Sequence, residues 1–378
     1  MTSLLKRYLQ DGYLAGCSAW TRRMLGGRSG PRRFDRVAIV AAFGKRNGIT
    51  QGAVLQWQAL RRAGVAAEMI DATAALRNPF HRVPHDPATA YIFHSGGPQT
   101  ASLIGAVLPA ARDAWRIGYW AWELPDPPPD WNGCDGNLNE IWTPSRFSRD
   151  SLMRAMRLPI EVVPHLLPAA PRRSRMPGAP FTVLTMADSR SSLSRKNPEG
   201  AVRAFQAAFG TGPAARLLLK IGASDADLQA LNARLGGALD APNIELIREF
   251  MSDEALAALY GRADVLLSLH RAEGFGLPML EALARGIPTV ATSWSGNMDF
   301  TTAENSLLVP YDVVPVADAG AVYHGSHWAE PDTAAAAAAL GRLAGDPDLY
   351  AQLSEAAYRG CNEQPFAFPL ERMHARAA

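Results

Sequence analysis

The chain has 378 residues, of which 48% are apolar and 20% are charged, and its net charge is only +2. This length suits two domains that each bury a hydrophobic core. The near-neutral charge gives no indication of nucleic-acid binding, and three widely spaced cysteines exclude a disulfide framework or a cysteine-rich metal site. No apolar run reaches the roughly 18 residues of a membrane span, and the first residues lack the apolar core of a signal peptide. We therefore expect a cytoplasmic protein that binds no nucleic acid.

Residues 1–34 form a basic N-terminal segment with a composition of its own. Up to residue 33, seven lysines and arginines stand against a single acidic residue, Asp11, and leucines and aromatic residues lie between the charges. This pattern is compatible with an amphipathic helix on an anionic membrane, which would place the protein at the inner face of the cell membrane. The simpler alternative is a solvated leader that packs on the following domain.

Residues 35–165 alternate between strand-like and helix-like segments, which predicts a parallel sheet with helices on both faces. The turn 43–48, which ends at Gly48, and the helix expected at 50–63 give the outline of a nucleotide-binding domain. The glycine spacing does not match the G-x-G-x-x-G fingerprint, so the turn alone supports no phosphate site. Apolar strands are expected at 37–42, 66–70, 90–94, 117–122 and 140–143.

A proline-rich linker is expected over residues 166–180. Five prolines between Pro164 and Pro180 exclude a helix or a central strand. A second alternating series follows over residues 181–360, and residues 361–378 form a C-terminal tail. We therefore expect an α/β fold in which two Rossmann-like parallel-sheet domains face each other across a cleft. In the second domain, strands are expected at 181–187, 216–221, 244–247, 265–269 and 287–291.

The stretch from Ala263 to Thr292 carries the strongest functional pattern. Between its two strands, a glycine-bearing loop leads into a short helix, with Pro278 at the first helical position and Gly286 just past the end. The backbone N–H groups of this loop and of the helix start are suited to an anion. The residues concerned are Gly274, Phe275, Gly276 and Leu277.

Two glutamates frame this loop. Glu281 is surrounded in the helix by apolar residues, so it would be a nearly buried charge without a structural purpose, and a pair of ribose hydroxyls would satisfy it. Glu273 is less constrained and could instead interact with the helix dipole.

Basic residues are expected at the same edge of the second sheet. Arg190 and Lys196 lie in the loop after its first strand, and Lys220 lies near the end of its second strand. Ligands bind at the carboxyl ends of the strands in such sheets. A diphosphate there would meet an arginine fork, a lysine charge and the loop amides together.

These residues resemble a known family. The phrase from Glu273 to Glu281, two glutamates separated by seven residues and followed by Arg285-Gly286-Ile287-Pro288, is similar to the signature of the GT-B retaining glycosyltransferases of family 4, also called glycosyl transferases group 1. Arg190 and Lys196, six residues apart, match that family's basic pair for the donor diphosphate. The resemblance is clearest over residues 181–311.

The resemblance implies an activity and a role for each residue. The enzyme would move a sugar from a nucleotide diphosphate-sugar to a glycan or lipid-linked acceptor, in bacterial polysaccharide or surface-glycan synthesis, with no metal or other cofactor. Glu281 would hold the nucleotide ribose, Glu273 would contact hydroxyls of the donor sugar, and Arg190 with Lys196 would neutralise the leaving diphosphate. Gly48 is a further donor-side candidate.

One departure from the family concerns the first domain. Many relatives carry a histidine that faces the donor sugar at about the place where this chain has Glu123, which is therefore a candidate polar group there. His94, at the end of the preceding strand, is the other candidate, although a packed strand-end histidine explains it as well. A sugar-nucleotide epimerase of the same architecture and a non-catalytic binding protein for sugar nucleotides or glycans remain alternatives.

Overall fold

The computed structural model describes residues 3–45, 47–176, 178–318, 323 and 325–362, with only the backbone described for residues 3–11. The described chain divides into two compact units. Among the described residues, the first comprises the chain up to Trp122 together with Asp126–Leu167, and the second comprises Glu123–Pro125 and the chain from Pro168 to Asn362. The division after Leu167 falls within the expected linker, and most of the expected C-terminal tail, residues 363–378, lies outside the described residues.

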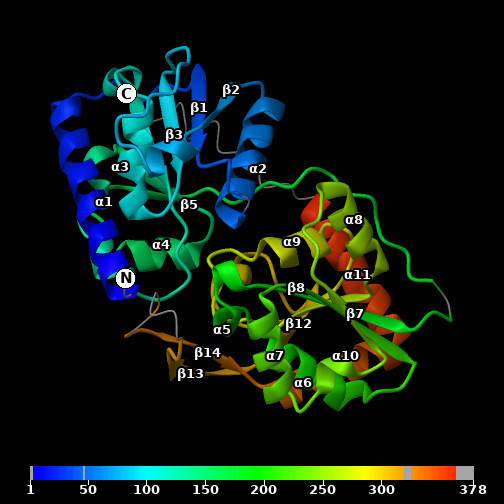
Figure 1. The fold of residues 1–378 in the computed structure, drawn as a ribbon. Coiled ribbons are helices and arrows are strands. Elements are labelled where there is room, and N and C mark those ends of the chain that lie inside the picture. The colour runs from blue at the N-terminus through cyan, green and yellow to red at the C-terminus, as the bar shows by residue number, and fades with distance from the viewer. Residues whose placement is uncertain (1–2, 46, 177, 319–322, 324, 363–378) are drawn as a thin grey trace. The chain divides into compact units, whose positions relative to one another are not determined.

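The first unit is built on a six-stranded parallel sheet with the strand order β2-β1-β3-β4-β5-β6 (Figure 1). Val37, Ile39, Ile92 and Ile117 are fully buried in its core, as expected for apolar strands that are covered on both faces. This confirms the parallel sheet predicted for this half. The strands are β1 (Arg36–Ala41), β2 (Ala66–Asp71), β3 (Ala90–His94), β4 (Trp115–Tyr119), β5 (Glu140–Thr143) and β6 (Ile160–Val162).

The basic N-terminal segment forms a long helix, α1 (Ser3–Leu25), which lies beside α3 (Gly97–Ala106) in Figure 1. Leu14, Cys17, Thr21 and Leu25 are buried and recur every three or four residues, so they share one face of the helix. The Thr21 hydroxyl donates a hydrogen bond to the carbonyl of Ala101, at 3.0 Å. This face of α1 therefore packs on the first unit. Of the helices described, none has both the length and the apolar character needed to cross a membrane.

Asn47 caps the helix α2 (Gly48–Arg62). Its side-chain oxygen accepts hydrogen bonds from the N–H groups of Ile49 and Thr50, each at 3.0 Å, and the Thr50 hydroxyl accepts one from the Asn47 N–H at 3.1 Å. Replacing Asn47 by alanine should lower the free energy of unfolding by about 1 kcal/mol, because two backbone donors lose their acceptor. Urea unfolding of this variant measures the loss. The control is Asn132→Ala at an exposed position, which should change the stability by less than about 0.5 kcal/mol; equal stabilities of the two variants would contradict the capping role.

The second unit has a six-stranded parallel sheet with the order β12-β11-β10-β7-β8-β9. Val183, Leu217, Leu267 and Val290 lie in its core with at most 1% exposure, which confirms the second parallel sheet. The strands are β7 (Phe181–Asp188), β8 (Ala215–Gly222), β9 (Ile244–Ile247), β10 (Val265–Ser268), β11 (Thr289–Thr292) and β12 (Ser306–Val309). The helices are α5 (Leu193–Lys196), α6 (Pro198–Phe209), α7 (Asp225–Arg234), α8 (Asp253–Arg262), α9 (Leu277–Leu283), α10 (Thr333–Gly345) and α11 (Pro347–Asn362). An α4 helix (Arg146–Leu152) completes the described helices of the first unit.

Several details of the second unit differ from the sequence prediction. The strand expected to begin at Ile287 begins at Thr289, after Pro288, which has no N–H to donate to a neighbouring strand. An antiparallel hairpin of β13 (Tyr311–Pro315) and β14 (His327–Pro331) follows the parallel sheet and was not predicted. Its strands show no simple alternation of apolar and polar residues, because Val313 is 59% exposed whereas Trp328 and Ala329, adjacent in sequence, are both buried.

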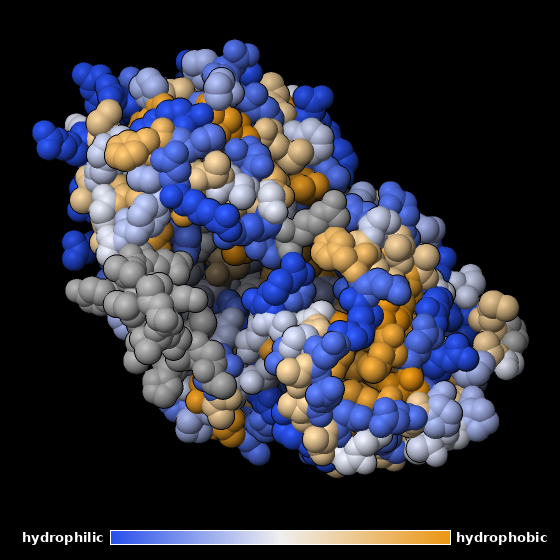
Figure 2. Space-filling model, viewed as in Figure 1, coloured by the Kyte–Doolittle hydropathy of each residue, from blue (hydrophilic) through white to orange (hydrophobic). Residues whose placement is uncertain are grey.

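On the face of the molecule shown in Figure 2, most of the surface is hydrophilic, and the clearest group of apolar side chains lies on the second unit. Among the described residues, the most exposed large apolar side chains are far apart in the sequence. Isolated exposed apolar residues are common on folded proteins, so we assign no interaction surface to them. They are Phe80, Met153, Met176, Phe250 and Val313.

Candidate functional site

The strand, loop, helix and strand predicted around the two glutamates are present as β10, residues 269–276, α9 and β11. Gly276 takes a φ of 101°, which a side chain would make unfavourable, and α9 begins directly after it. Pro278 is the second residue of α9 and not the first, and Gly286 follows the end of the helix with a φ of 69°. Because α9 has only seven residues, its dipole contributes little to the electrostatic potential at this loop. Charged side chains dominate that potential.

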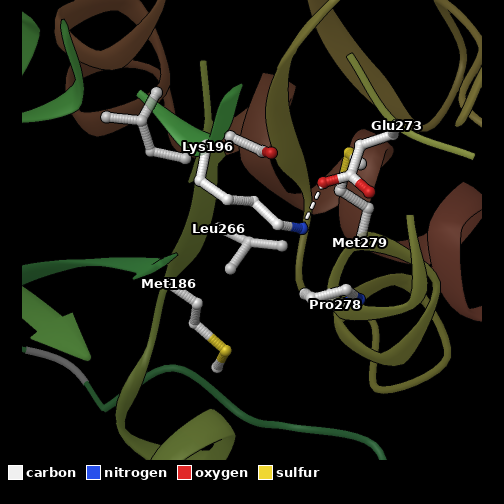
Figure 3. A pocket seen from close by; sticks show the side chains of 8 residues that line it. Met186, Lys196, Leu266, Glu273, Pro278 and Met279 are labelled. Atoms are coloured by element: carbon white, nitrogen blue, oxygen red, sulfur yellow. Dashed lines mark hydrogen bonds and ion pairs between the residues drawn. The ribbon is translucent and has the colours of Figure 1, made fainter. Parts of the chain in front are cut away.

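Glu273 lies between two cations at the end of β10. Its carboxylate forms an ion pair with the amine of Lys196, drawn as a dashed line in Figure 3, and its Oε2 lies 3.4 Å from Nη1 of Arg195. Lys196 and Glu273 line a small pocket with apolar side chains from β7, β10 and α9, among them Met186, Leu266 and Met279. The structure therefore brings together Lys196 and Glu273, which the sequence predicted separately.

The charge of Glu273 is set by these neighbours. Burial alone would raise the pKa of its carboxyl, but the charges of Lys196 and Arg195, with a smaller effect of His270, outweigh burial and lower the pKa to about 2. Glu273 is therefore ionised throughout the ordinary pH range. A buried, ionised carboxylate of this kind is available to accept hydrogen bonds from a ligand's hydroxyl groups.

Arg195 is a site residue that the sequence analysis missed. It is 5% exposed, its Nη1 donates to the carbonyl of Ala272 at 2.7 Å, and its Nε lies 3.4 Å from the carboxylate of Glu123. Burial lowers the pKa of Arg195, but the carboxylates of Glu123 and Glu273 more than compensate and raise it above the usual value. The sequence indicates only that Arg195 directly precedes Lys196. Two adjacent basic residues are normally both exposed, so this position gave no indication that Arg195 is buried.

A second loop, after β11, supports the first one. The Glu273 N–H donates to the Ser295 hydroxyl and the Gly296 N–H donates to the Glu273 carbonyl, both at 2.9 Å. A Cβ atom on Gly296 would lie 2.3 Å from the carbonyl oxygen of Gly274, so only glycine fits. Asn297 lies behind both loops, and its side-chain oxygen is 3.1 Å from Nε2 of the buried His270. Burial lowers the pKa of His270, which indicates a neutral ring.

Glu281 lies in α9 and is partly buried. Its Oε2 accepts a hydrogen bond from the hydroxyl of Tyr260 in α8, at 2.8 Å. Burial raises the pKa of Glu281, and the Tyr260 hydroxyl and Arg285 partly oppose this effect. The structure thus confirms that α9 carries a largely desolvated carboxylate, and it supplies a protein partner that the sequence did not indicate.

Arg190 forms a bidentate pair with Asp188 at the end of β7. Its Nε lies 3.0 Å from Oδ1, and its Nη2 lies 2.5 Å from Oδ2. The Arg190 side chain is 60% exposed, and its pairing with Asp188 raises its pKa. Lys220 lies near the same carboxylate, and its pKa is lowered by burial against the opposing effect of Asp188. Arg190 is therefore bound to Asp188 in this structure, and an anionic ligand would compete with that carboxylate.

The remaining candidates have different surroundings. His94 ends β3 in the first unit, where it is 2% exposed, lies 2.6 Å from the side-chain oxygen of Gln56 and stacks on Tyr119. Burial, together with His165, holds the pKa of His94 well below its usual value, so it has the properties of a packed, neutral strand-end histidine. Gly48 is the first residue of α2 in the first unit.

Glu123 groups with the second unit, together with Leu124 and Pro125, although the chain before and after these three residues belongs to the first. Its carboxylate accepts a hydrogen bond from the Tyr323 hydroxyl and faces Arg195. Glu123 and Glu273 therefore share one buried arginine.

Within the described part of the chain, no group of three or more histidine, cysteine, aspartate or glutamate side chains is arranged to hold a metal ion.

A model of the family described as "Family 4 Glycosyltransferase in conflict systems" matches residues 146–356, more than half of the chain. The chain belongs to this glycosyltransferase family. The match includes Arg190, Lys196, Glu273 and Glu281, and it confirms the resemblance found in the sequence. No curated protein matches the sequence.

Solved structures share the GT-B fold of this family member. Sucrose-phosphate synthase from Thermosynechococcus elongatus matches with a TM-score of 0.63 and 16% identity, over 90% of this chain and 96% of that chain. Anabaena HepE in complex with UDP and glucose matches with a TM-score of 0.61 and 13% identity, over 90% and 97%. A mutant of TarM from S. aureus, in complex with fondaparinux, alpha-GlcNAc-glycerol and UDP, matches with a TM-score of 0.57 and 12% identity, over 76% of this chain. The chain spans only 55% of the TarM chain. At these identities, the similarity shows the fold alone.

Proposed function

We propose that this protein is a retaining glycosyltransferase that moves a sugar from a nucleotide diphosphate-sugar to a glycan or lipid-linked acceptor. The observation that supports this proposal best is the ion-paired group of Lys196, Glu273 and Arg195 at the carboxyl end of β10, within the region that matches the family model. We further propose that the enzyme works without a metal, in the cytoplasm, in the synthesis of a bacterial polysaccharide or surface glycan.

The proposed reaction exchanges one bond of the sugar's anomeric carbon. The bond to the diphosphate oxygen breaks, a bond to an acceptor hydroxyl oxygen forms, and the hydroxyl proton is released. The leaving nucleoside diphosphate keeps the bonding electrons, so negative charge develops on it. Lys196 would neutralise that charge, and Arg190 would join it on release from Asp188. The UDP in the HepE and TarM complexes supports a nucleoside diphosphate as the leaving group.

The carboxylates have separate roles in this proposal. Glu273, which is ionised and held by two cations, would accept hydrogen bonds from the donor sugar and keep Lys196 in place. Glu281 would accept hydrogen bonds from the ribose. Glu123, which shares Arg195 with Glu273, is proposed as a polar group close to the reacting sugar. The burial of His94 and its bond to Gln56 favour a packing role for that residue.

The test is a thermal-shift screen with UDP, GDP, ADP and their common sugar conjugates, followed by an acceptor assay with the donor that binds. The proposal expects stabilisation by one nucleotide class and release of nucleoside diphosphate that depends on an added acceptor. Interconversion of donor sugars without an acceptor would favour the epimerase, and binding without turnover would favour a non-catalytic protein. No binding of any nucleotide would contradict the transferase, the epimerase and a sugar-nucleotide-binding protein, and would leave only the glycan-binding protein. Membrane association of α1 stays a prediction, which sedimentation with anionic vesicles would test.

Removing divalent cations should leave sugar transfer unchanged. Fixed cations and amides, and not a bound metal, are proposed to stabilise the leaving diphosphate. The measurement is the transfer rate after dialysis against EDTA, compared with the rate after Mg²⁺ or Mn²⁺ is added back. A rate that falls on dialysis and returns with the metal would contradict metal-independent transfer.

A further inference from the structure

Tyr260 connects α8 to the part of α9 that carries Glu281. Its side chain is fully buried, and its hydroxyl oxygen lies 2.8 Å from Oε2 of Glu281 and 3.1 Å from the carbonyl oxygen of Pro278. A phenol has one proton to donate, and a carboxylate is a stronger acceptor than a carbonyl. The Tyr260 hydroxyl therefore donates mainly to Glu281, across 21 residues of sequence.

The ring of Tyr260 is fixed on several sides. It packs in a buried cluster with Met279 and Ala282 of α9, and the guanidinium of Arg285 lies 4.9 Å from the ring centroid. Arg285 also donates to the backbone carbonyl of Glu281, at 2.7 Å. The hydroxyl thus has little freedom to move, and neither has the carboxylate oxygen that it binds. The second oxygen of Glu281, Oε1, makes no hydrogen bond with any residue that the structure describes.

We propose that Tyr260 is a positioning residue that holds the Glu281 carboxylate so that its Oε1 accepts hydrogen bonds from the nucleotide ribose. This inference rests on the role of Glu281 in the proposed function. A carboxylate on a side chain with three rotatable bonds would otherwise lose conformational freedom when the nucleotide binds. Fixing one oxygen beforehand removes most of that cost.

The experiment compares the wild type with Glu281→Gln, Tyr260→Phe and the control Tyr350→Phe. Tyr350 lies in α11 and interacts with Arg173. Isothermal titration measures the affinity for UDP, GDP and ADP and for the 2′-deoxy counterpart of each, and thermal unfolding confirms that each variant is folded. For the nucleotide that binds the wild type, we expect a preference for the ribose form. Glu281→Gln should remove this preference, and Tyr260→Phe should reduce it by about threefold to tenfold, the loss expected for one hydrogen bond. Tyr350→Phe should retain it.

The possible failures are distinguishable. If Glu281→Gln removes the ribose preference while Tyr260→Phe keeps it at the wild-type level, the positioning role is wrong and the ribose role of Glu281 stands. If Glu281→Gln itself keeps the preference, the ribose role fails and the inference fails with it. A Tyr260→Phe variant that weakens binding of ribose and 2′-deoxy forms equally has only lost structure, and this result would also overturn the positioning role.

Discussion

Exchanging Glu273 for glutamine should lower the turnover number by about 100- to 1,000-fold, the loss typical when one fixed electrostatic group of an active site is removed. Glutamine has nearly the same shape, but it carries no charge with which to hold Lys196 and Arg195. It also accepts hydrogen bonds from sugar hydroxyls more weakly than a carboxylate does. The transfer rate at saturating donor and acceptor measures the effect. A matched control is Glu304→Gln at an exposed position of the same unit, which should turn over like the wild type.

The same substitution should change how stability depends on pH. The pKa of Glu273 is about 2 in the folded protein and about 4.5 in an unfolded chain, so its ionisation stabilises the fold above the unfolded value. That contribution, on the order of 3 kcal/mol, is lost as the pH falls from about 4.5 towards 2. Between pH 7 and pH 3, the melting temperature of the wild type should therefore fall more steeply than that of Glu273→Gln. Parallel melting curves for the two proteins would show that the carboxylate is not held by its cations.

Replacing Lys196 by methionine should weaken the binding of a nucleoside diphosphate by about 100-fold, because a charge-assisted contact to phosphate is lost. Methionine keeps an unbranched apolar stem of similar length, so the pocket walls formed by Leu266 and Met279 should keep their packing. The affinity for the nucleoside without phosphates should change little. This ratio, measured by titration with UDP and uridine or with the corresponding pair for the base that binds, separates a phosphate role from general damage.

Lys45→Met is the control for this experiment, since Lys45 is an exposed lysine of the first unit. If Lys196→Met weakened nucleoside and nucleoside diphosphate equally, Lys196 would serve only to neutralise Glu273. Diphosphate affinity at the wild-type level would remove Lys196 from the donor site altogether.

Much of the fold could be predicted because local signals coincided with the tertiary structure. The helix from Pro198 to Phe209 is capped by Asn197 and followed by Gly210, and both residue types are typical of helix ends. The strands Ala90–His94, Glu140–Thr143 and Ile244–Ile247 have the predicted bounds, because each is a short, mainly apolar run between polar residues or proline. The β13–β14 hairpin escaped prediction because its strands show no simple alternation of apolar and polar residues: Val313 is exposed, whereas Trp328 and Ala329 are both buried.

The site was predictable only in part, for a related reason. Glu273 and Lys196 each belong to a recognisable sequence motif. The two residues are 77 positions apart in the sequence, and neither motif indicates that their side chains form an ion pair. Arg195 and Tyr260 have no pattern of their own, since a buried arginine between two carboxylates and a buried tyrosine hydroxyl are defined by what folds against them. His94 is a further example: at a strand end it is a catalytic candidate in the sequence, and only the structure shows that it is packed against Gln56 and Tyr119.

The close packing of Gly296 against Gly274 couples the loop after β10 to the loop after β11, so that neither can move alone. The loop after β10 cannot shift outward without taking the Glu273 backbone away from Ser295, and it cannot shift inward because the Gly296 backbone already touches it. A change of donor preference in this protein would therefore require coordinated replacements in both loops. Libraries that keep Glu273 and randomise residues 274–277 alone should return mostly unfolded or inactive variants, whereas libraries that also vary residues 295–297 can sample new loop conformations.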